Sequence, residues 1–278
     1  MSTATARRTA QGAGRRAAHS GWVEYAGRVG LVAKAVSYAL IGILAIQIPL
    51  GQGGQAADRQ GVLRQISTES WGKAALVALT IGFACYALWR FAEAFFDRQG
   101  EGTDPKGLAK RAKAFGVGVV YAASAVLSWS LLTSSSSSAG TGSEQQETAR
   151  VLEWPGGRWI VLAAAVAFIA DGLYNVYRGW TKKFRERLME YEMHGAVQTW
   201  AIRSGVLGHV ARGVVFTMIG VFLGKAAIEY DPNEAVGIDG ALLKLAQHDQ
   251  GPLLLGLVAA GLIAYALYCL VEARYRKI

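Results

Sequence analysis

Asp171 is the side chain whose chemistry most needs an explanation in this sequence. It lies well inside an apolar run over about 159–177, and Asn175 is the polar residue one helical turn away. An ionisable group at the centre of a membrane helix costs about 2.5–3.5 kcal/mol on insertion scales and marks a functional site by default. Two interpretations stay open: a proton or cation site, or a neutral acid in a structural hydrogen bond to Tyr38 or Tyr121.

Two basic and two acidic residues also lie inside apolar runs. Lys34 and Arg212 sit a short way inside one end of their helices, and Glu93 and Glu272 lie near the same end of the helices that follow. The helices of a hairpin are antiparallel, so these groups reach similar depths. This predicts ion pairs Lys34–Glu93 and Arg212–Glu272. The alternative is that the long basic side chains reach the membrane interface without a partner.

A polar path through the molecule is one use for these groups. The hydroxyls of Tyr38, Tyr121 and Tyr265 would line it together with Asp171. His209 lies close to Arg212 in sequence and could relay protons. The simpler interpretation of such a histidine near a helix end is an interfacial hydrogen-bonding group.

The sequence contains no signature of an enzyme. A phosphate-binding Gly-rich loop, a His-Glu-x-x-His helix and a Gly-x-Ser-x-Gly elbow are all absent from it. Its two cysteines, Cys85 and Cys269, do not give a metal-ligand spacing. We therefore expect no catalytic residue, no cofactor and no metal site.

The elements that must position these residues are membrane helices. The chain is 52% hydrophobic and 18% charged, whereas a soluble domain carries about 25% charged residues. A bilayer span needs about 20 mostly apolar residues. Runs of that kind occur at about 29–50, 74–96, 114–133, 159–177, 205–228 and 252–272. These runs lack the polar stripe of an amphipathic helix and predict an all-α membrane protein with six transmembrane helices.

The helices belong to an internal repeat. The stretch Gly30–Gly42 returns at Gly208–Gly220, and a weaker third copy spans Lys113–Ala125. The second helix of the unit recurs as well, with Tyr86 and Tyr265 at equivalent positions and Asp171 at that position in the middle copy. Recurring units of this size indicate a repeat architecture. We expect three tandem helical hairpins related by pseudo-threefold symmetry.

The domain organisation follows from these repeats. We predict one integral-membrane domain made of repeat 1 at 22–99, repeat 2 at 105–181 and repeat 3 at 200–278, after a disordered basic tail at 1–21. Short amphipathic helices at 61–66, 149–152 and 240–245 are expected to lie at the outer surface. The basic stretch 180–191 predicts a helix on the inner leaflet, or else an extension of the fourth span.

The net charge of +9 does not indicate nucleic acid, because of where the charge lies. Most Lys and Arg gather in the N-terminal tail, between spans two and three, between spans four and five, and after span six. Such segments mark the cytoplasmic side. We expect a multi-pass protein of a bacterial plasma membrane with both termini cytoplasmic. Its predicted partner is the lipid bilayer, with anionic lipids contacting the basic segments; the oligomeric state stays open.

These motifs resemble those of a bacterial membrane family catalogued as domain of unknown function 1206. The resemblance rests on the first-helix pattern Gly30, Lys34, Tyr38 and Gly42 with its copy from Gly208, and on the second-helix endings. It covers about residues 22–277 and is weakest in the middle repeat. It implies three tandem two-helix repeats and a membrane location, and it transfers no activity.

Two functions remain as hypotheses from the sequence. The first is a small-solute or ion transporter or channel, with Asp171 and the tyrosine hydroxyls on its path. The second is a non-transporting membrane scaffold or lipid-organising protein whose polar groups are only satisfied structurally. A polar cavity at Asp171 favours the first, and a sealed core favours the second.

Overall fold

The computed structural model describes residues 21–47, 72–96, 104–133, 143–247 and 250–276. Within these ranges, six helices are long and apolar enough to cross a membrane. They are α2 (Gly21–Gln47), α4 (Gly72–Phe96), α5 (Pro105–Thr133), α7 (Gly157–Trp180), α8 (Ala196–Glu229) and α10 (Gly251–Tyr275). The prediction of an all-α protein with six spans is confirmed.

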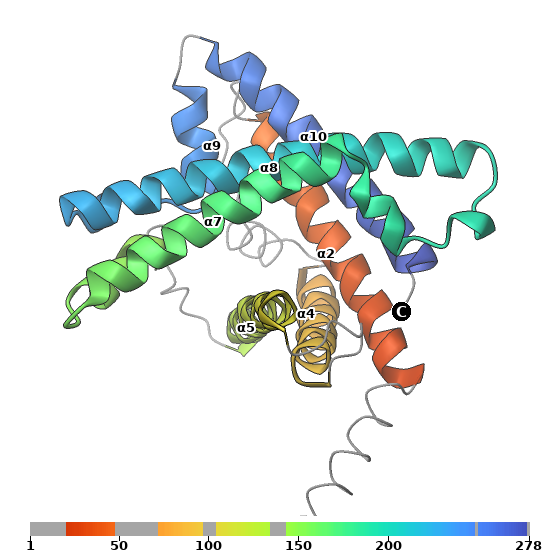
Figure 1. Cartoon of the computed structure of the whole chain (residues 1–278), viewed down its shortest axis with the longest axis horizontal. Helices are drawn as coiled ribbons and strands as arrows, with labels where there is room; N and C mark the ends of the chain where they lie inside the picture. The colour runs from red at the N-terminus through yellow and green to blue at the C-terminus, as the bar shows by residue number, and fades with distance from the viewer. Residues whose placement is uncertain (1–20, 48–71, 97–103, 134–142, 248–249, 277–278) are drawn as a thin grey trace, which may run out of the picture.

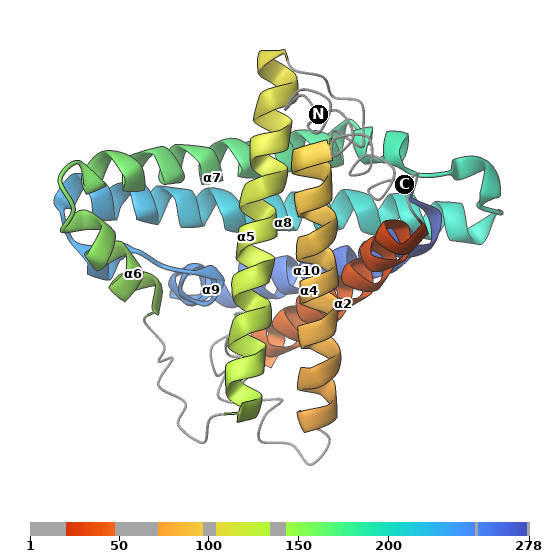
Figure 2. The ribbon, with the colours of Figure 1, turned by 90° about the horizontal axis from the view of Figure 1, so that it is seen from below.

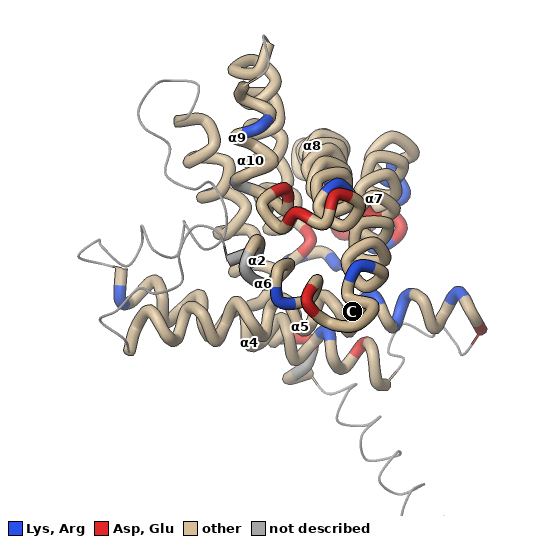
Figure 3. Tube along the Cα trace, turned by 90° about the vertical axis from the view of Figure 1, so that its left-hand side faces the viewer, with Lys and Arg blue, Asp and Glu red and all other residues tan. Residues whose placement is uncertain are grey.

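The outer surface of these helices is apolar. Leu88 is 65% exposed, Val126 69% and Leu257 63%, and most of α4 is uncharged along its length (Figure 3). Scattered apolar residues are normal on soluble proteins, but large contiguous apolar surfaces mark contact with a membrane or a partner. Lipid is the environment that these surfaces fit.

The helices pack as three antiparallel pairs that cross one another. In Figure 2, α4 and α5 run vertically, α7 and α8 run horizontally, and α2 lies obliquely along α10. Each of these pairs joins two neighbouring repeats, because α4 precedes α5, α7 precedes α8, and α10 returns to α2. Figure 1 shows the α4–α5 pair end-on, beneath α7 and α8.

Glycines fix the contact between two such repeats. A Cβ placed on Gly42 of α2 would lie 2.9 Å from the Ala259 carbonyl oxygen of α10. A Cβ on Gly220 of α8 would lie 2.8 Å from the Ala165 carbonyl oxygen of α7. Gly42 and Gly220 are equivalent in the repeat, so the two interfaces are copies of each other. Small residues allow this close approach of membrane helices, and the pattern supports the predicted pseudo-threefold arrangement.

Glycines also close the hairpins of the first and third repeats. A Cβ on Gly30 of α2 would collide with Tyr86 of α4, and a Cβ on the equivalent Gly208 of α8 would lie 2.5 Å from Tyr265 Cα of α10. Helices α2 and α4 are therefore in direct contact, as are α8 and α10. Over their full described lengths, α5 and α7 of the middle repeat share no extended interface.

The short segments differ in part from the predictions. Helices α6 (Ser143–Leu152) and α9 (Ile238–Ala246) contain the short helices predicted for the second and third repeats. The one predicted at 61–66 lies outside the described residues, as does the N-terminal tail except for Gly21. The helix predicted at 180–191 is wrong.

That stretch instead forms turns that pack against α8 and the end of α10. The chain leaves α7 and forms two 3-10 turns, η1 (Lys183–Arg187) and η2 (Glu190–Glu192). Lys182 adopts φ 57°, a left-handed conformation that ends the helix. Phe184 is fully buried, and a Cβ on Gly205 of α8 would lie 2.5 Å from its ring. The Phe184 side chain is therefore buried between helices, where a helix lying on the membrane surface could not place it.

Candidate functional site: a cationic pocket

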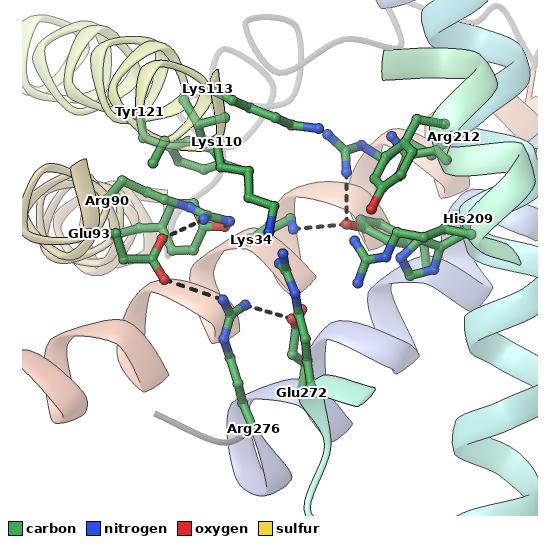
Figure 4. A pocket seen from close by; sticks show the side chains of 18 of the residues that line it. Lys34, Arg90, Glu93, Lys110, Lys113, Tyr121, His209, Arg212, Glu272 and Arg276 are labelled. Carbon is green, nitrogen blue, oxygen red and sulfur yellow. Dashed lines mark hydrogen bonds and ion pairs between the residues drawn. The ribbon is translucent and has the colours of Figure 1, made fainter. Parts of the chain in front are cut away.

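A pocket lies where the charged ends of the six helices converge. Its volume is ≈ 400 Å³, within the range of about 300–1,000 Å³ that is usual for ligand pockets. Side chains reach it from α2, α4, α5, α7, α8 and α10, and from η1 (Figure 4). Its charged lining residues are Lys34, Arg90, Glu93, Lys110, Arg111, Lys113, Arg178, Arg187, Arg212, Glu272 and Arg276.

This lining is strongly unbalanced in charge. Nine of its side chains are Lys or Arg and two are Glu. Tyr86, Tyr121, Tyr174 and Tyr265 add hydroxyls, and Asn175 adds an amide. Cations at membrane depth are costly without counter-charges, so the balance of partners decides what the pocket can bind.

The two glutamates are already engaged with arginines. Arg276 Nη1 donates to Glu272 Oε1 at 2.6 Å, and Arg276 Nη2 lies 3.4 Å from Glu93 Oε1. Arg90 Nη1 donates to Glu93 Oε2 at 2.7 Å. Arg276 is 2% exposed, and its guanidinium lies 4.3 Å from the ring centre of Trp89. This network joins the ends of α4 and α10 and uses both carboxylates to neutralise two arginines.

Lys34 and Arg212 meet at one tyrosine. Lys34 Nζ donates to the Tyr265 hydroxyl oxygen at 2.9 Å, and Arg212 Nη1 donates to the same oxygen at 3.0 Å. The predicted ion pairs Lys34–Glu93 and Arg212–Glu272 are therefore wrong. These four residues line one pocket, but the partners differ from those predicted.

The geometry of the helices explains the difference. Helix α10 packs against both α2 and α8, which places Tyr265 between Lys34 and Arg212. The glutamates lie nearer to the helix ends. There, Arg90 and Arg276 lie three and four residues from them in the same helices, and such spacings bring side chains together without tertiary contacts.

Asp171 is ion-paired rather than neutral. Its Oδ1 pairs with Lys113 Nζ of α5, and its Oδ2 lies 3.8 Å from Arg212 Nη2. The predicted hydrogen bond to Tyr38 or Tyr121 is wrong, because two cations offer a carboxylate a stronger interaction than a hydroxyl does. Asn175 Nδ2 donates to the backbone oxygen of Asp171 at 2.7 Å.

The Lys113–Asp171 pair replaces the contact that closes the other hairpins. By repeat position, Lys113 corresponds to Gly30 and Asp171 corresponds to Tyr86. Where the first and third repeats pack a glycine against a tyrosine, the middle repeat spans the distance with two charged side chains. The α5–α7 hairpin stays open at this point, and residues of both helices line the pocket there.

The remaining predicted path residues lie around this centre. Tyr38 is 3% exposed and packs edge-on against Tyr265, with the ring centroids 4.9 Å apart. Tyr121 packs on Tyr86 at 4.4 Å and lines the pocket. His209 Nδ1 lies 2.8 Å from the Gly205 carbonyl oxygen, and its ring stacks on Phe184.

Part of the excess positive charge of the lining comes from three of its cations. In the part of the chain that the structure describes, Lys34, Arg178 and Arg187 make no ion pair with a carboxylate. Burial lowers the pKa of Arg187 from its ordinary value, and the guanidinium groups of Arg276 and Arg178 lower it further. The Nε atoms of Arg90 and Arg212 are also buried and have no hydrogen-bond acceptor among the described residues. Within the described ranges, the pocket therefore has donors and positive charge that no acceptor or carboxylate satisfies.

The segment after α7 holds Arg187 at the pocket. Leu188 forms an antiparallel bridge with Arg276, and Met189 N donates to the Tyr275 oxygen at 2.7 Å. This backbone contact places Arg187 beside the end of α10. Sequence reasoning missed Arg178, Arg187 and Arg276 because they look like ordinary cytoplasmic orientation signals.

Six apolar helices in three tandem hairpins, joined around a cationic pocket, define a multi-pass helical membrane protein. The chain belongs to the family described as Domain of Unknown Function (DUF1206), which matches residues 29–97, 112–182 and 207–276. It is similar to the "Uncharacterized protein YxxB" of Bacillus subtilis (strain 168), with 32% identity over 257 residues that cover 92% of each chain. No solved structure matches.

Proposed function

We propose that this protein binds an anion in the cationic pocket from the cytoplasmic side of a bacterial plasma membrane, as one step in transport of a small anion. The observation that carries the proposal is the charge of the lining, with nine cationic side chains and two glutamates around ≈ 400 Å³. A bound anion would offset the desolvation of cations that have no carboxylate partner.

Lys34, Arg212 and Tyr265 are the proposed anion ligands. Their polar atoms converge within 3.0 Å of one hydroxyl oxygen, and both cations come from equivalent positions of the first and third repeats. Sites at the interface between repeats are usual in transporters built from internal repeats. In the absence of a bound anion, Asp171 would serve as the counter-charge for Lys113 and Arg212.

The direction of access follows from the charge pattern. The pocket lies at the end of the bundle where α2, α5 and α8 begin and α4, α7 and α10 end. These are the ends flanked by the Lys- and Arg-rich segments that mark the cytoplasmic side. The supported arrangement is therefore a pocket open toward the cytoplasm.

Transport requires a further step beyond this pocket. Along α2, Tyr38 and Ile41 follow Lys34 on the inner face and are buried, with 3% and 1% of their surfaces exposed. Phe83 of α4 is fully buried beside them. An anion would cross this apolar layer only if the repeats moved relative to one another, as alternating-access transporters do.

The test measures binding and flux separately. We expect sulfate and phosphate to raise the apparent melting temperature of the detergent-purified protein at constant ionic strength, because a ligand bound to the folded state stabilises it. Lys34→Met and Arg212→Met should lose this effect, whereas Lys106→Met, an exposed lysine on α5 outside the pocket, should keep it. A wild-type protein that no anion stabilises would overturn the proposal.

Flux into proteoliposomes distinguishes transport from binding alone. We expect uptake of the stabilising anion by wild type and altered uptake by Asp171→Asn. The second candidate is the non-transporting, lipid-organising protein, which is favoured by the lack of an extended interface between α5 and α7. Binding without flux would favour that candidate.

A further inference from the structure

We infer that the ligand of the cationic pocket is the phosphate group of an anionic phospholipid, which reaches the pocket sideways through the α5–α7 gap. This gap is the opening between Lys110 and Lys113 of α5 and Tyr174 and Arg178 of α7, all of which line the pocket. The inference rests on the anion site of the proposed function; it assigns a lipid phosphate to that site in place of a small soluble anion, and it adds the route.

The gap arises where the middle hairpin departs from the other two. Gly30 against Tyr86 and Gly208 against Tyr265 bring their helices into backbone contact. Helices α5 and α7 have no extended interface over their described lengths, and Lys113 crosses between them to Asp171. The wall of the pocket on this side is therefore made of long side chains, which can move without unpacking a helix.

The rim of the gap has the composition of a membrane interface. The Lys113 side chain is 53% exposed, and its Nζ lies 5.4 Å from the ring centre of Tyr174, which is itself 48% exposed. Just beyond, Lys183 Nζ lies 4.9 Å from the ring centre of Tyr177. Tyrosine and lysine side chains together are favoured at the headgroup level, and basic pockets between helices on the cytoplasmic side bind lipid headgroups.

The interior fits a phosphate group. Arg178 and Arg187 line the pocket without a carboxylate partner in the described part of the chain, and Arg212 lies deeper with Lys34 at Tyr265. Guanidinium groups present paired donors that match phosphate oxygens, and lysine adds a point charge. Exposed apolar residues of α5, including Phe115 at 45% and Val119 at 47%, provide lipid contacts for acyl chains outside the gap.

The test compares a lipid phosphate with a soluble one. The protein in a non-ionic detergent is mixed with dioleoyl phosphatidylglycerol, dioleoyl phosphatidylcholine, free glycerol phosphate or inorganic phosphate. Bound lipid is measured by native mass spectrometry, and stabilisation is measured by the apparent melting temperature. We expect phosphatidylglycerol to be retained and to stabilise more than the soluble phosphates, and phosphatidylcholine to do neither.

Matched variants test the route. Lys113→Gln should weaken phosphatidylglycerol binding about tenfold, because the charge-assisted hydrogen bond from the lysine to the phosphate is lost. Lys106→Gln, on the same helix and outside the pocket, should bind as wild type does. Arg178→Gln tests the other side of the gap and replaces Lys113→Gln if that variant does not fold.

The outcomes separate the two proposals. If glycerol phosphate stabilises the protein as well as phosphatidylglycerol does, the lipid route is wrong and the anion pocket stands. Equal losses in Lys106→Gln and Lys113→Gln would also overturn the route. If neither soluble phosphates nor phosphatidylglycerol bind, both proposals are wrong.

Discussion

The closed hairpins α2–α4 and α8–α10 differ from the open hairpin α5–α7 at two equivalent positions. The closed ones place Gly30 or Gly208 against a tyrosine of the following helix, whereas the open one places Lys113 opposite Asp171. The first arrangement gives helix contact, and the second gives a wall of the cationic pocket. The comparison teaches that a repeat protein can build a site by changing the residues at one contact of one copy.

The largest expected effect comes from adding a methyl group to a closed hairpin. Gly30→Ala and Gly208→Ala should each lower the free energy of unfolding by about 3 kcal/mol, the upper part of the usual overpacking range, because backbone atoms leave no room for a Cβ. Thermal unfolding in detergent measures the effect. Gly256→Ala is the control, since no atom lies within 4 Å of its added Cβ; equal stability of all three variants would remove the distinction between hairpins.

The second prediction converts the open hairpin into a closed one. The double variant Lys113→Gly, Asp171→Tyr gives the middle repeat the residues of the other two. We expect α5 and α7 to approach, and the affinity for anions to fall about tenfold or more, as when a charge-assisted hydrogen bond is lost. An anion titration, monitored through the apparent melting temperature, measures this affinity. Unchanged binding would show that these two positions do not hold the pocket open.

The third prediction concerns the open hairpin alone. Lys113→Ala should lower the free energy of unfolding by only about 1 kcal/mol, because a half-exposed ion pair contributes little and Arg212 remains 3.8 Å from Asp171. The same unfolding assay compares it directly with Gly30→Ala. A loss as large as that of Gly30→Ala would mean that the pair is a structural contact like the glycine.

The smallest expected effect lies in the segment between α8 and α10. Hydrogen bonds from Lys244 and Lys225 lower the pKa of Glu234 to about 2. Because the folded-state pKa is lowered, the stabilisation is present above the unfolded value of about 4.3 and is lost as the pH falls toward 2. Hydrogen exchange of residues 232–246 should rise over that interval in wild type. In Glu234→Gln, exchange should be faster at neutral pH and should not change as the pH falls; a parallel response of both proteins would exclude Glu234 as the cause.

Much of the fold follows from the sequence. Hydropathy locates the six helices, and the recurrence of Gly30–Gly42 at Gly208–Gly220 indicates the repeat, because both depend on local composition and spacing. The family match and the six apolar helices confirm these predictions. The basic stretch 180–191 was misjudged because burial of Phe184 is a tertiary contact that helical periodicity does not report.

The site was only partly predictable. Asp171, Lys34 and Arg212 stood out because charge is rare at membrane depth. Their partners depend on which helices touch, and the pairing of α2 with α10 across the whole chain is not visible in sequence spacing. The sequence alignment places Lys113 at the position of Gly30 and Asp171 at the position of Tyr86. It predicts that Lys113 lies opposite Asp171 only once the contact between Gly30 and Tyr86 is known.

The pairing of α2 with α10 also has a consequence for biogenesis. The face of α2 that carries Gly42 receives its partner only when residues 251–275 leave the ribosome. Until then, α2 has this side open, and the contact that closes the ring of helices between α10 and α2 cannot form. A nascent chain that stops before Gly251 would therefore expose the Gly42 face, and an exposed packing surface of this kind favours wrong helix pairing.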